Sequence, residues 1–258
     1  MDRSLAREAA TLLASARATL EECAEEGVEA IEPRAAATAA LAPEPQRPAS
    51  PGADGGIQGD LLVPDALFGA EPTLDGVREV LGDCTRCPLC EGRSQIVFGD
   101  GNPRADLLFV GEGPGEQEDR RGIPFVGRAG ELLTQMIERG LGVPRRDVYI
   151  CNIVKCRPPG NRTPLPPEVA ACRPFLDGQI DAIRPKVIVA LGRPATNLLL
   201  GREVSITRVR GSWHEYRGYP LMPTFHPAFI LRQYTEENRR HVWEDLKAAL
   251  ERSRQAPL

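Results

Sequence analysis

Residues 107–115 read LLFVGEGPG, an apolar run of four residues that leads directly into three glycines within five positions. A short, uninterrupted apolar run bounded by glycine is typical of a strand buried on both faces of a parallel sheet. Pro223 interrupts one further run of this kind, as proline does in edge strands. The runs that we predict to be buried strands are 107–110, 148–150 with 153–154, 187–191 and 221–225.

Segments with helical periodicity separate these strands. Pro167 near the start of one segment and Gly140 at the end of another are usual helix boundaries. Alternating strands and helices predict a mainly parallel sheet with helices on both faces, and ligands bind beyond the carboxyl ends of such strands. The predicted helices are Gly127–Gly140, Pro166–Ile183, Pro194–Leu200 and Glu236–Ser253.

The charge of the chain is unevenly distributed. Of the net charge of −4, residues 1–75 contribute −9 and the remainder +5. A mildly basic body suits a polyanionic partner, although ordinary surface variation explains the same numbers equally well. No apolar run reaches the roughly 18–20 residues of a membrane span, and the N-terminus lacks a signal peptide. We therefore expect a cytoplasmic, nucleoid-associated protein without a membrane partner.

Composition divides the chain into three parts. Residues 1–30 form an acidic, alanine-rich extension, in which we predict a helix over Asp2–Glu26. Residues 31–73 are rich in Pro, Ala and Gly and contain too few large apolar residues to fold, which is typical of a linker. Residues 74–253 carry the strands and helices and form the folded domain. The extension is a candidate for binding another, unidentified protein.

Cysteine spacing indicates a metal centre. In a reducing cytoplasm cysteines serve as ligands or catalysts more often than as disulfides. The Cys84-x2-Cys87 pair, with two later cysteines, suits either zinc or an iron–sulfur cluster, whereas buried apolar thiols are the structural alternative. Cys90 forms a second C-x2-C with Cys87. The seven cysteines are 23, 84, 87, 90, 151, 156 and 172.

The loop after the first strand lacks the known nucleotide-binding patterns. Glu116 stands where the dinucleotide fingerprint needs glycine, and no Gly-Lys-Ser/Thr follows to make a phosphate-binding loop.

Two aromatic side chains, Phe125 and His226, follow a glycine-rich loop and a predicted strand, respectively. Phe125 could stack on a flat ligand or fill the core, and His226, ahead of an apolar stretch and Arg232, could belong to a wedge for DNA or lie on the surface.

Taken together, these segments resemble the iron–sulfur uracil-DNA glycosylases of bacteria and archaea, usually called family 4. The resemblance spans about residues 80–250, in the order expected for that family. It implies a three-layer α/β/α sandwich around a central four-stranded parallel sheet, within the 74–253 domain. The motifs that carry it are Gly111–Gly115, Gly122–Gly127, Asn152–Pro159, Gly192–Ala195 and His226–Pro227.

The resemblance implies a function and a cofactor. The function is a monofunctional, monomeric glycosylase that flips uracil out of single- or double-stranded DNA, hydrolyses the N-glycosidic bond and leaves an abasic site for base excision repair. The cofactor is a [4Fe–4S] cluster on Cys84, Cys87, Cys156 and Cys172, with Cys90 as the spare. We expect the cluster to hold the 156–172 segment in place.

The resemblance also assigns residues to the base. Gly111 lies in the loop that holds uracil, Phe125 stacks on the ring, and Asn152 reads its edge. Glu118 lies near uracil C5 and crowds out the thymine methyl, and His226 contacts uracil O2. An asparagine amide offers one donor and one acceptor, which match uracil and mismatch cytosine.

Catalysis and DNA binding are assigned to further residues. Glu112 and Gly113 position the attacking water, and Asn161 is a second candidate for orienting it. His226 stabilises the departing uracil anion through a hydrogen bond that strengthens in the transition state. The residues expected to face DNA phosphates are Arg157, Arg162 and Arg232.

Three other interpretations fit parts of the sequence. A uracil-DNA binder that traps the base is disfavoured, because related binders carry an inserted basic loop with a histidine that residues 159–164 lack. A zinc-bearing interaction module predicts a colourless protein, whereas a cluster predicts absorbance at about 400 nm. A glycosylase for another damaged base is compatible with the same fold.

Overall fold

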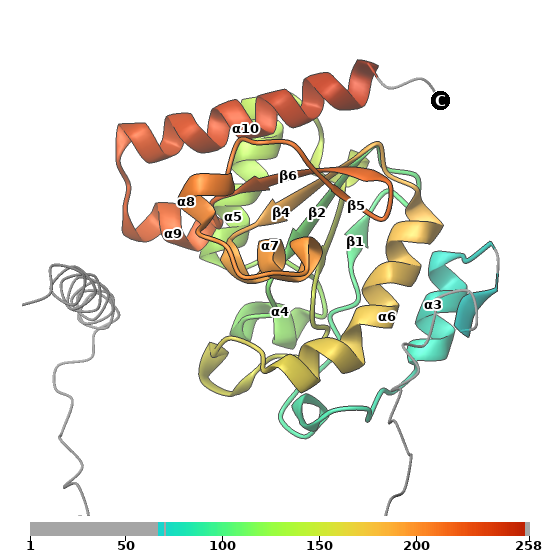
Figure 1. The fold of residues 1–258 in the computed structure, drawn as a ribbon. Helices are drawn as coiled ribbons and strands as arrows, with labels where there is room; N and C mark the ends of the chain where they lie inside the picture. Colours follow the sequence, from blue (N-terminus) through green and yellow to red (C-terminus); the bar gives the residue numbers. More distant parts are fainter. Residues whose placement is uncertain (1–66, 70, 256–258) are drawn as a thin grey trace, which may run out of the picture. The chain divides into compact units, whose positions relative to one another are not determined.

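The computed structural model describes residues 67–69 and 71–255 (Figure 1). The acidic extension at 1–30, the helix predicted over 2–26 and most of the 31–73 linker lie outside the described residues. Within the described part, Phe68 already contacts the domain, because its ring centroid lies 6.0 Å from that of Phe175. The contacts of the folded domain therefore begin before the expected boundary at residue 74.

The sheet has six strands in the order β1-β3-β2-β4-β6-β5. Its four central strands are parallel, which confirms the predicted core, and a short antiparallel strand lies at each edge. The edge strands were not predicted, because they are only two and three residues long. The strands are β1 (Asp100–Gly101), β2 (Leu107–Gly111), β3 (Tyr149–Asn152), β4 (Val187–Leu191), β5 (His214–Tyr216) and β6 (Tyr219–Thr224).

Helices cover both faces of the sheet, as the apolar strands predict (Figure 1). Side chains alternate along β2, so that Leu108 and Val110 join one apolar cluster, while Leu107 and Phe109 join the other. The first cluster includes residues of α6 (Pro166–Ile183) and α7 (Arg193–Leu200). The second includes residues of α5 (Arg128–Gln135), the π-helix at Met136–Leu141, α9 (Pro227–Arg232) and α10 (Glu236–Gln255).

Most predicted elements agree with the structure to within a few residues. Helix α6 has the predicted bounds, whereas the helix expected over 127–140 is divided between α5 and the π-helix. Four α-helices were missed, because each is short: α3 (Leu74–Leu81), α4 (Glu116–Arg121), α8 (Ile206–Val209) and α9. Helix α3 adds an outer layer by packing on α6.

Pro223 lies inside β6, although proline was expected to weaken this strand. The strand β5 pairs only with Tyr219–Leu221, so Pro223 lies beyond the end of β5 and needs no amide hydrogen for that ladder. Its carbonyl still accepts a hydrogen bond from Gly211 at 3.1 Å. The missing donor is therefore tolerated at this point of the sheet.

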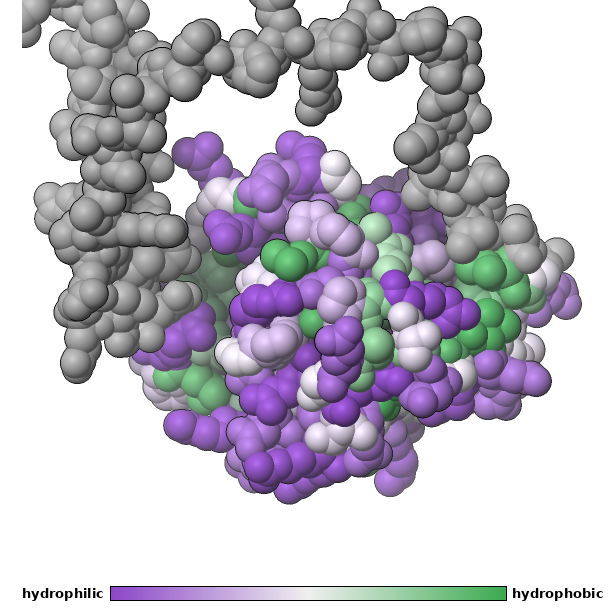
Figure 2. Space-filling model, turned by 90° about the horizontal axis from the view of Figure 1, so that it is seen from below, coloured by the Kyte–Doolittle hydropathy of each residue, from purple (hydrophilic) through white to green (hydrophobic). Residues whose placement is uncertain are grey.

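The carboxyl ends of the parallel strands meet at one edge of the sheet. Gly111 is the register partner of Asn152, and Leu191 is that of Thr224. Figure 2 views the domain from below, the side of α4, and shows a largely hydrophilic face with a few hydrophobic residues near its middle. The described helices include none that is both long and apolar enough to cross a membrane.

Candidate active site

The floor of the site is formed where β2 and β3 end side by side. A Cβ atom on Gly111 would lie 2.5 Å from the Asn152 Oδ1 and 2.5 Å from the Phe125 Cζ. Contacts this short do not occur between real side chains, so only glycine fits here. The predicted residues Gly111, Phe125 and Asn152 therefore lie in direct proximity.

The Asn152 side chain is buried without a hydrogen-bond partner. Its exposed fraction is 1%, and neither Oδ1 nor Nδ2 has a partner within the described residues. A buried polar group left unpaired costs about 1–3 kcal/mol, and most such groups in proteins are paired. The amide is thus ready to exchange one donor and one acceptor with a ligand.

Phe125 lies over this floor in an unusual backbone conformation. Its φ is +53°, in the left-handed region, and its exposed fraction is only 7%. Gly130 makes this close approach possible, because a Cβ on Gly130 would lie 1.9 Å from the Phe125 carbonyl carbon. The ring is buried, as the core interpretation expected, and it also contacts the end of β2 beside Asn152.

His226 completes this group from the loop between β6 and α9. Its ring centroid lies 5.6 Å from that of Phe125, with a 37° angle between the planes. The Ala228 backbone N–H donates to His226 Nδ1 at 3.1 Å. Burial, together with the charge of Arg232, lowers the pKa of His226 to about 4. The ring is therefore neutral at pH 7 and carries its hydrogen on Nε2.

The glycine-rich loop continues from β2 across the site. The Gly111 carbonyl accepts from the Ile153 N–H at 2.9 Å, which joins this loop to the end of β3. Burial raises the pKa of Glu112, whereas Thr163 and Arg193 act in the opposite direction. A Cβ on Gly113 would lie 3.0 Å from Val154 Cγ2. Glu112 is half-buried and is therefore a better proton acceptor than a fully exposed carboxylate.

The acidic residues that follow this loop bind protein groups. Glu118 accepts from the backbone N–H groups of Val126 and Gly127 at 2.9 and 2.8 Å. Asp119 is buried and accepts from the Ser94 N–H. From the sequence alone, these carboxylates could equally have formed an acidic turn exposed to solvent. In the fold, Glu118 holds the segment that follows Phe125.

The loop at 157–164, here called the basic loop, lies beside the site, because Thr163 approaches Glu112 and a Cβ on Gly113 would lie 3.7 Å from Pro158. Arg157 donates to the Asn161 Oδ1 at 2.8 Å, and Asn161 itself is exposed. Arg162 forms two hydrogen bonds, of 2.9 and 2.6 Å, with the buried carboxylate of Glu168. Arg232 is exposed at the end of α9. The assignment of these arginines to DNA phosphates stays a prediction.

The cysteines of the predicted metal centre form a second group. The thiol of Cys156 interacts electrostatically with Cys87 and Cys84, and that of Cys172 with Cys156 and Cys87. Cys90 lies close to Cys87, and burial raises the pKa of Cys172 to about 12. All six cysteines of the described part are free thiols. Of the four that the resemblance assigned to one centre, Cys84, Cys87 and Cys156 are neighbours of one another, and Cys172 is a neighbour of Cys87 and Cys156.

Two arginines donate to these sulfur atoms. Arg86 Nη1 lies 3.3 Å from Cys84 Sγ, and Arg93 Nη1 lies 3.5 Å from Cys156 Sγ. Arg93 also donates to the Cys84 carbonyl at 2.6 Å. Within the described residues, no three His, Cys, Asp or Glu side chains are grouped closely enough for a single metal ion. Guanidinium groups at thiolates suit an anionic centre.

Several residues near the site were not found from the sequence. Arg145 donates to the Pro124 carbonyl at 2.7 Å, and Thr163 and Arg193 approach Glu112. Gly130 in α5 packs against the Phe125 backbone, and Glu168 in α6 binds Arg162. Arg193 lies in the Gly192–Ala195 motif but had no assigned role, and the others are common residue types outside the motifs, so only the fold brings them to the site.

Comparisons with known proteins agree with this arrangement. The model of the uracil DNA glycosylase superfamily matches residues 98–247, which include β2, β3 and the loop of His226. This chain belongs to that superfamily. A type-4 uracil-DNA glycosylase of Thermotoga maritima is 51% identical over 185 residues, which are 71% of this chain and 96% of the relative.

Two archaeal relatives extend the comparison. The type-4 uracil-DNA glycosylase of Sulfurisphaera tokodaii is 46% identical over 183 residues, covering 68% of this chain and 82% of the relative. That of Saccharolobus solfataricus is 44% identical over 189 residues, covering 68% and 87%. The chain therefore belongs to the type-4 group of the superfamily, and the expected family is confirmed.

Proposed function

We infer that this protein is a uracil-DNA glycosylase that hydrolyses the bond between uracil and deoxyribose in DNA. The observation that carries the inference is the buried, unpartnered amide of Asn152 beneath the ring of Phe125. A glycosylase cannot reach this bond inside a stacked duplex, so the base must be flipped into a pocket. A flat base that offers one acceptor and one donor would satisfy both atoms of the amide.

Uracil fits this amide better than cytosine. The Asn152 Nδ2 would donate to uracil O4, and Oδ1 would accept from N3–H. Cytosine presents the opposite pattern, so that in this orientation of the amide both of its groups would stay unpaired. Glu118 supports the choice against thymine, because the protein holds its carboxylate close to the segment that follows Phe125. We propose that this carboxylate leaves no room for the thymine methyl at C5.

His226 would stabilise the leaving group. Because Nδ1 already accepts from Ala228, the neutral ring has an Nε2–H free to donate to uracil O2. Cleavage breaks the bond between C1′ and N1, and its electron pair leaves with uracil as an anion. A hydrogen bond to O2 strengthens as that charge develops, so it favours the transition state over the bound substrate.

The attacking water would be held by the glycine-rich loop. Glu112 and Gly113 lie at the end of β2, and the raised pKa of Glu112 suits a group that accepts a proton from water. The water oxygen forms the new bond to C1′, and the proton passes to the carboxylate. Asn161 is exposed and already bonded to Arg157, so its contribution would be to orient the water.

We propose that Cys84, Cys87, Cys156 and Cys172 hold a [4Fe–4S] cluster. The proximity of Cys87 and Cys156 to the other two and the two arginine contacts to sulfur suit an anionic cluster, and Cys90, a neighbour of Cys87, would be the spare thiol. When bound, the cluster supplies a covalent cross-link between segments distant in sequence. The cluster would thereby hold residues 84–87 against residues 156–172, the segment that contains the loop at 157–164.

Further parts of the proposal concern DNA and the cell. Arg157 and Arg232 would contact backbone phosphates of single- or double-stranded DNA, and Arg162 would join them from its ion pair with Glu168. We expect a monomer that works in the cytoplasm, at the nucleoid where its substrate lies. The acidic extension at 1–30 would serve to bind another protein.

The test is an excision assay on labelled oligonucleotides that differ only in one uracil, thymine or cytosine. The expected result is an alkali-labile abasic site with uracil alone. Asn152→Ala should lower the rate on uracil about 10²–10³-fold, by analogy with the removal of one transition-state donor. If the wild-type protein forms no abasic site from uracil, or if N152A keeps the full rate, the inference is wrong.

A further inference from the structure

Phe125 lies in a backbone conformation that needs outside support. Among the described residues, four that are not glycine have a positive φ, and Phe125 is the one of them whose ring lies against Gly111. The left-handed region is unfavourable for residues with a side chain, and it persists where surrounding contacts hold it. The orientation of the ring over Gly111 and Asn152 therefore depends on its flanking peptide groups.

Hydrogen bonds hold the peptide groups on both sides of Phe125. On the preceding side, the Pro124 carbonyl accepts from Arg145 Nη2 at 2.7 Å. On the following side, the N–H groups of Val126 and Gly127 donate to Glu118 at 2.9 and 2.8 Å. The roles of these two supports differ, because Glu118 is already proposed to meet the base, whereas Arg145 has no assigned role.

Arg145 also ties this segment to α5. Its Nη1 donates to Thr134 Oγ1 at 2.8 Å, and the Thr134 hydroxyl donates to the Gly130 carbonyl at 2.9 Å. Gly130 is the residue against which the Phe125 backbone lies. One guanidinium thus bridges the peptide before Phe125 and the helix that supports it. A planar group with several fixed donors is suited to this task.

We propose that Arg145 is a positioning residue for the base, acting through Phe125. By fixing the Pro124 carbonyl and α5 together, Arg145 keeps the Phe125 ring parallel to the place where a flipped base would lie. The inference rests on the stacking role proposed for Phe125. It concerns binding of the base, so loss of Arg145 should weaken binding of uracil more than binding of DNA.

The chain offers a matched control in the next residue. The Arg146 side chain is 87% exposed, and its contact with Asp147 is a loose one at 3.9 Å. The experiment compares Arg145→Ala, Arg145→Lys and Arg146→Ala in the full chain. The measurements are kcat on a uracil oligonucleotide, inhibition by free uracil, affinity for an abasic-site oligonucleotide, and Tm.

The expected result follows from the loss of base stacking. R145A should raise the inhibition constant of free uracil about tenfold, since stacking of a base on an aromatic ring contributes about 1–3 kcal/mol. It should lower kcat and leave the affinity for abasic DNA unchanged. R145K, with one ammonium for two acceptors, should lie between R145A and the wild type, and R146A should match the wild type. If R145A does not fold, R145K alone decides the matter by the same criteria.

Phe125→Leu separates this inference from the proposed function. If Arg145 acts through Phe125, the double variant R145A/F125L should bind uracil no more weakly than F125L alone. Losses that multiply, or an R145A variant with lower Tm but unchanged inhibition by uracil, would overturn the inference while uracil excision itself stands. An F125L variant with unchanged uracil inhibition would show that the stacking role is wrong, and the inference with it.

Discussion

The substitution Gly111→Ala should disable the site through a single methyl group. The added Cβ would lie 2.5 Å from both Asn152 Oδ1 and Phe125 Cζ, whereas ordinary van der Waals contacts begin at 3.4 Å. The backbone cannot relieve this contact easily, because Gly111 is paired with Asn152 in the sheet and its carbonyl binds Ile153. The Asn152 amide and the Phe125 ring must therefore move away from residue 111.

The size of the effect follows from the required displacement. To reach an ordinary contact distance, both groups must move by about 1 Å, and a misplacement of that size can cost about 10²-fold in rate. We therefore expect kcat/KM on a uracil oligonucleotide to fall about 100-fold. The strain of an overfilled site should lower the free energy of unfolding by about 1–3 kcal/mol.

Excision kinetics and urea denaturation together measure both effects. Gly92→Ala is the matched control, because a Cβ on Gly92 meets no atom within 4 Å and the residue has an ordinary φ. G92A should keep the wild-type rate and stability. If G111A excises uracil within threefold of the wild-type rate, the close packing of Gly111, Asn152 and Phe125 does not define the base site.

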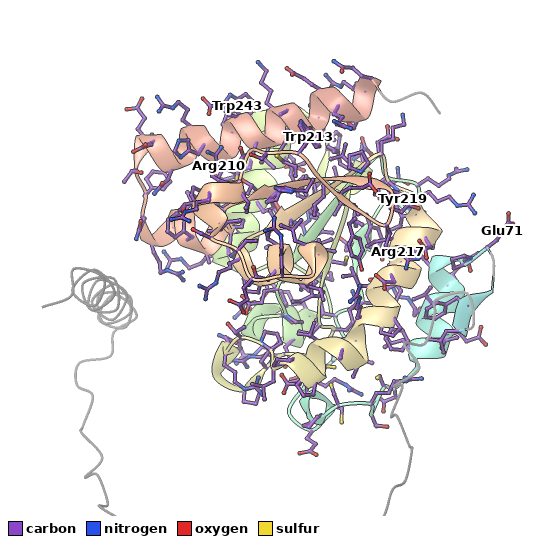
Figure 3. All side chains as sticks on the ribbon, viewed as in Figure 1. Glu71, Arg210, Trp213, Arg217, Tyr219 and Trp243 are labelled. Carbon is purple, nitrogen blue, oxygen red and sulfur yellow. The ribbon has the colours of Figure 1, made fainter. Side chains whose placement is uncertain are left out.

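Three further predictions concern other parts of the molecule. Because the pKa of His226 is lowered to about 4, below its usual value of 6.5, the unfolded chain takes up a proton between these values that the folded chain does not. The unfolding free energy of the wild type, measured by urea titration, should therefore fall more than that of His226→Gln as the pH is lowered from 6.5 to 4. Equal pH dependence of the two unfolding free energies would contradict this. Cys87→Ser should lose bound iron and the absorbance at about 400 nm, whereas Cys90→Ser should keep both; equal losses would refute the ligand assignment. Arg210, which lies beside α10 (Figure 3), forms an ion pair with Asp245, and their side chains are 15% and 1% exposed. R210A leaves the buried Asp245 carboxylate without its cation, with the Thr224 hydroxyl still donating to it at 2.6 Å, and should lower stability by about 3–5 kcal/mol in the same denaturation assay. Much of the loss should be recovered in R210M/D245L, and a loss under about 1 kcal/mol for R210A would show that the pair is dispensable.

The core of the fold was predictable because its elements repeat a simple pattern. The runs at 107–110 and 187–191 are apolar throughout, and such strands are stable only between two layers of helices. Helix α6 was found with its bounds because proline marks its start. Short elements such as β5 and α8 were missed, because three or four residues carry too little periodicity to stand out from a loop.

The residues of the site were likewise predictable only in part. His226 was noted from its place after a predicted strand, whereas Asn152 was found only through the resemblance, which assigned both residues to the base. The sequence offered two interpretations of Phe125, as a core residue and as a stacking residue, and the structure shows that it is buried and also contacts the site. The function of Glu118 as an acceptor for two backbone groups was not visible, because its partners lie eight and nine residues further along.

The sequence by itself determined the layered α/β architecture, the family and the cysteines available to a cluster. These conclusions depend on local periodicity, glycine and cysteine spacing, and motif order, all of which are written along the chain. Only the tertiary structure decided that Asn152 lacks a partner, that Gly111 has no room for a methyl group, and that Arg145 holds the peptide before Phe125. Such properties depend on distances between residues remote in sequence, and packing alone sets those distances.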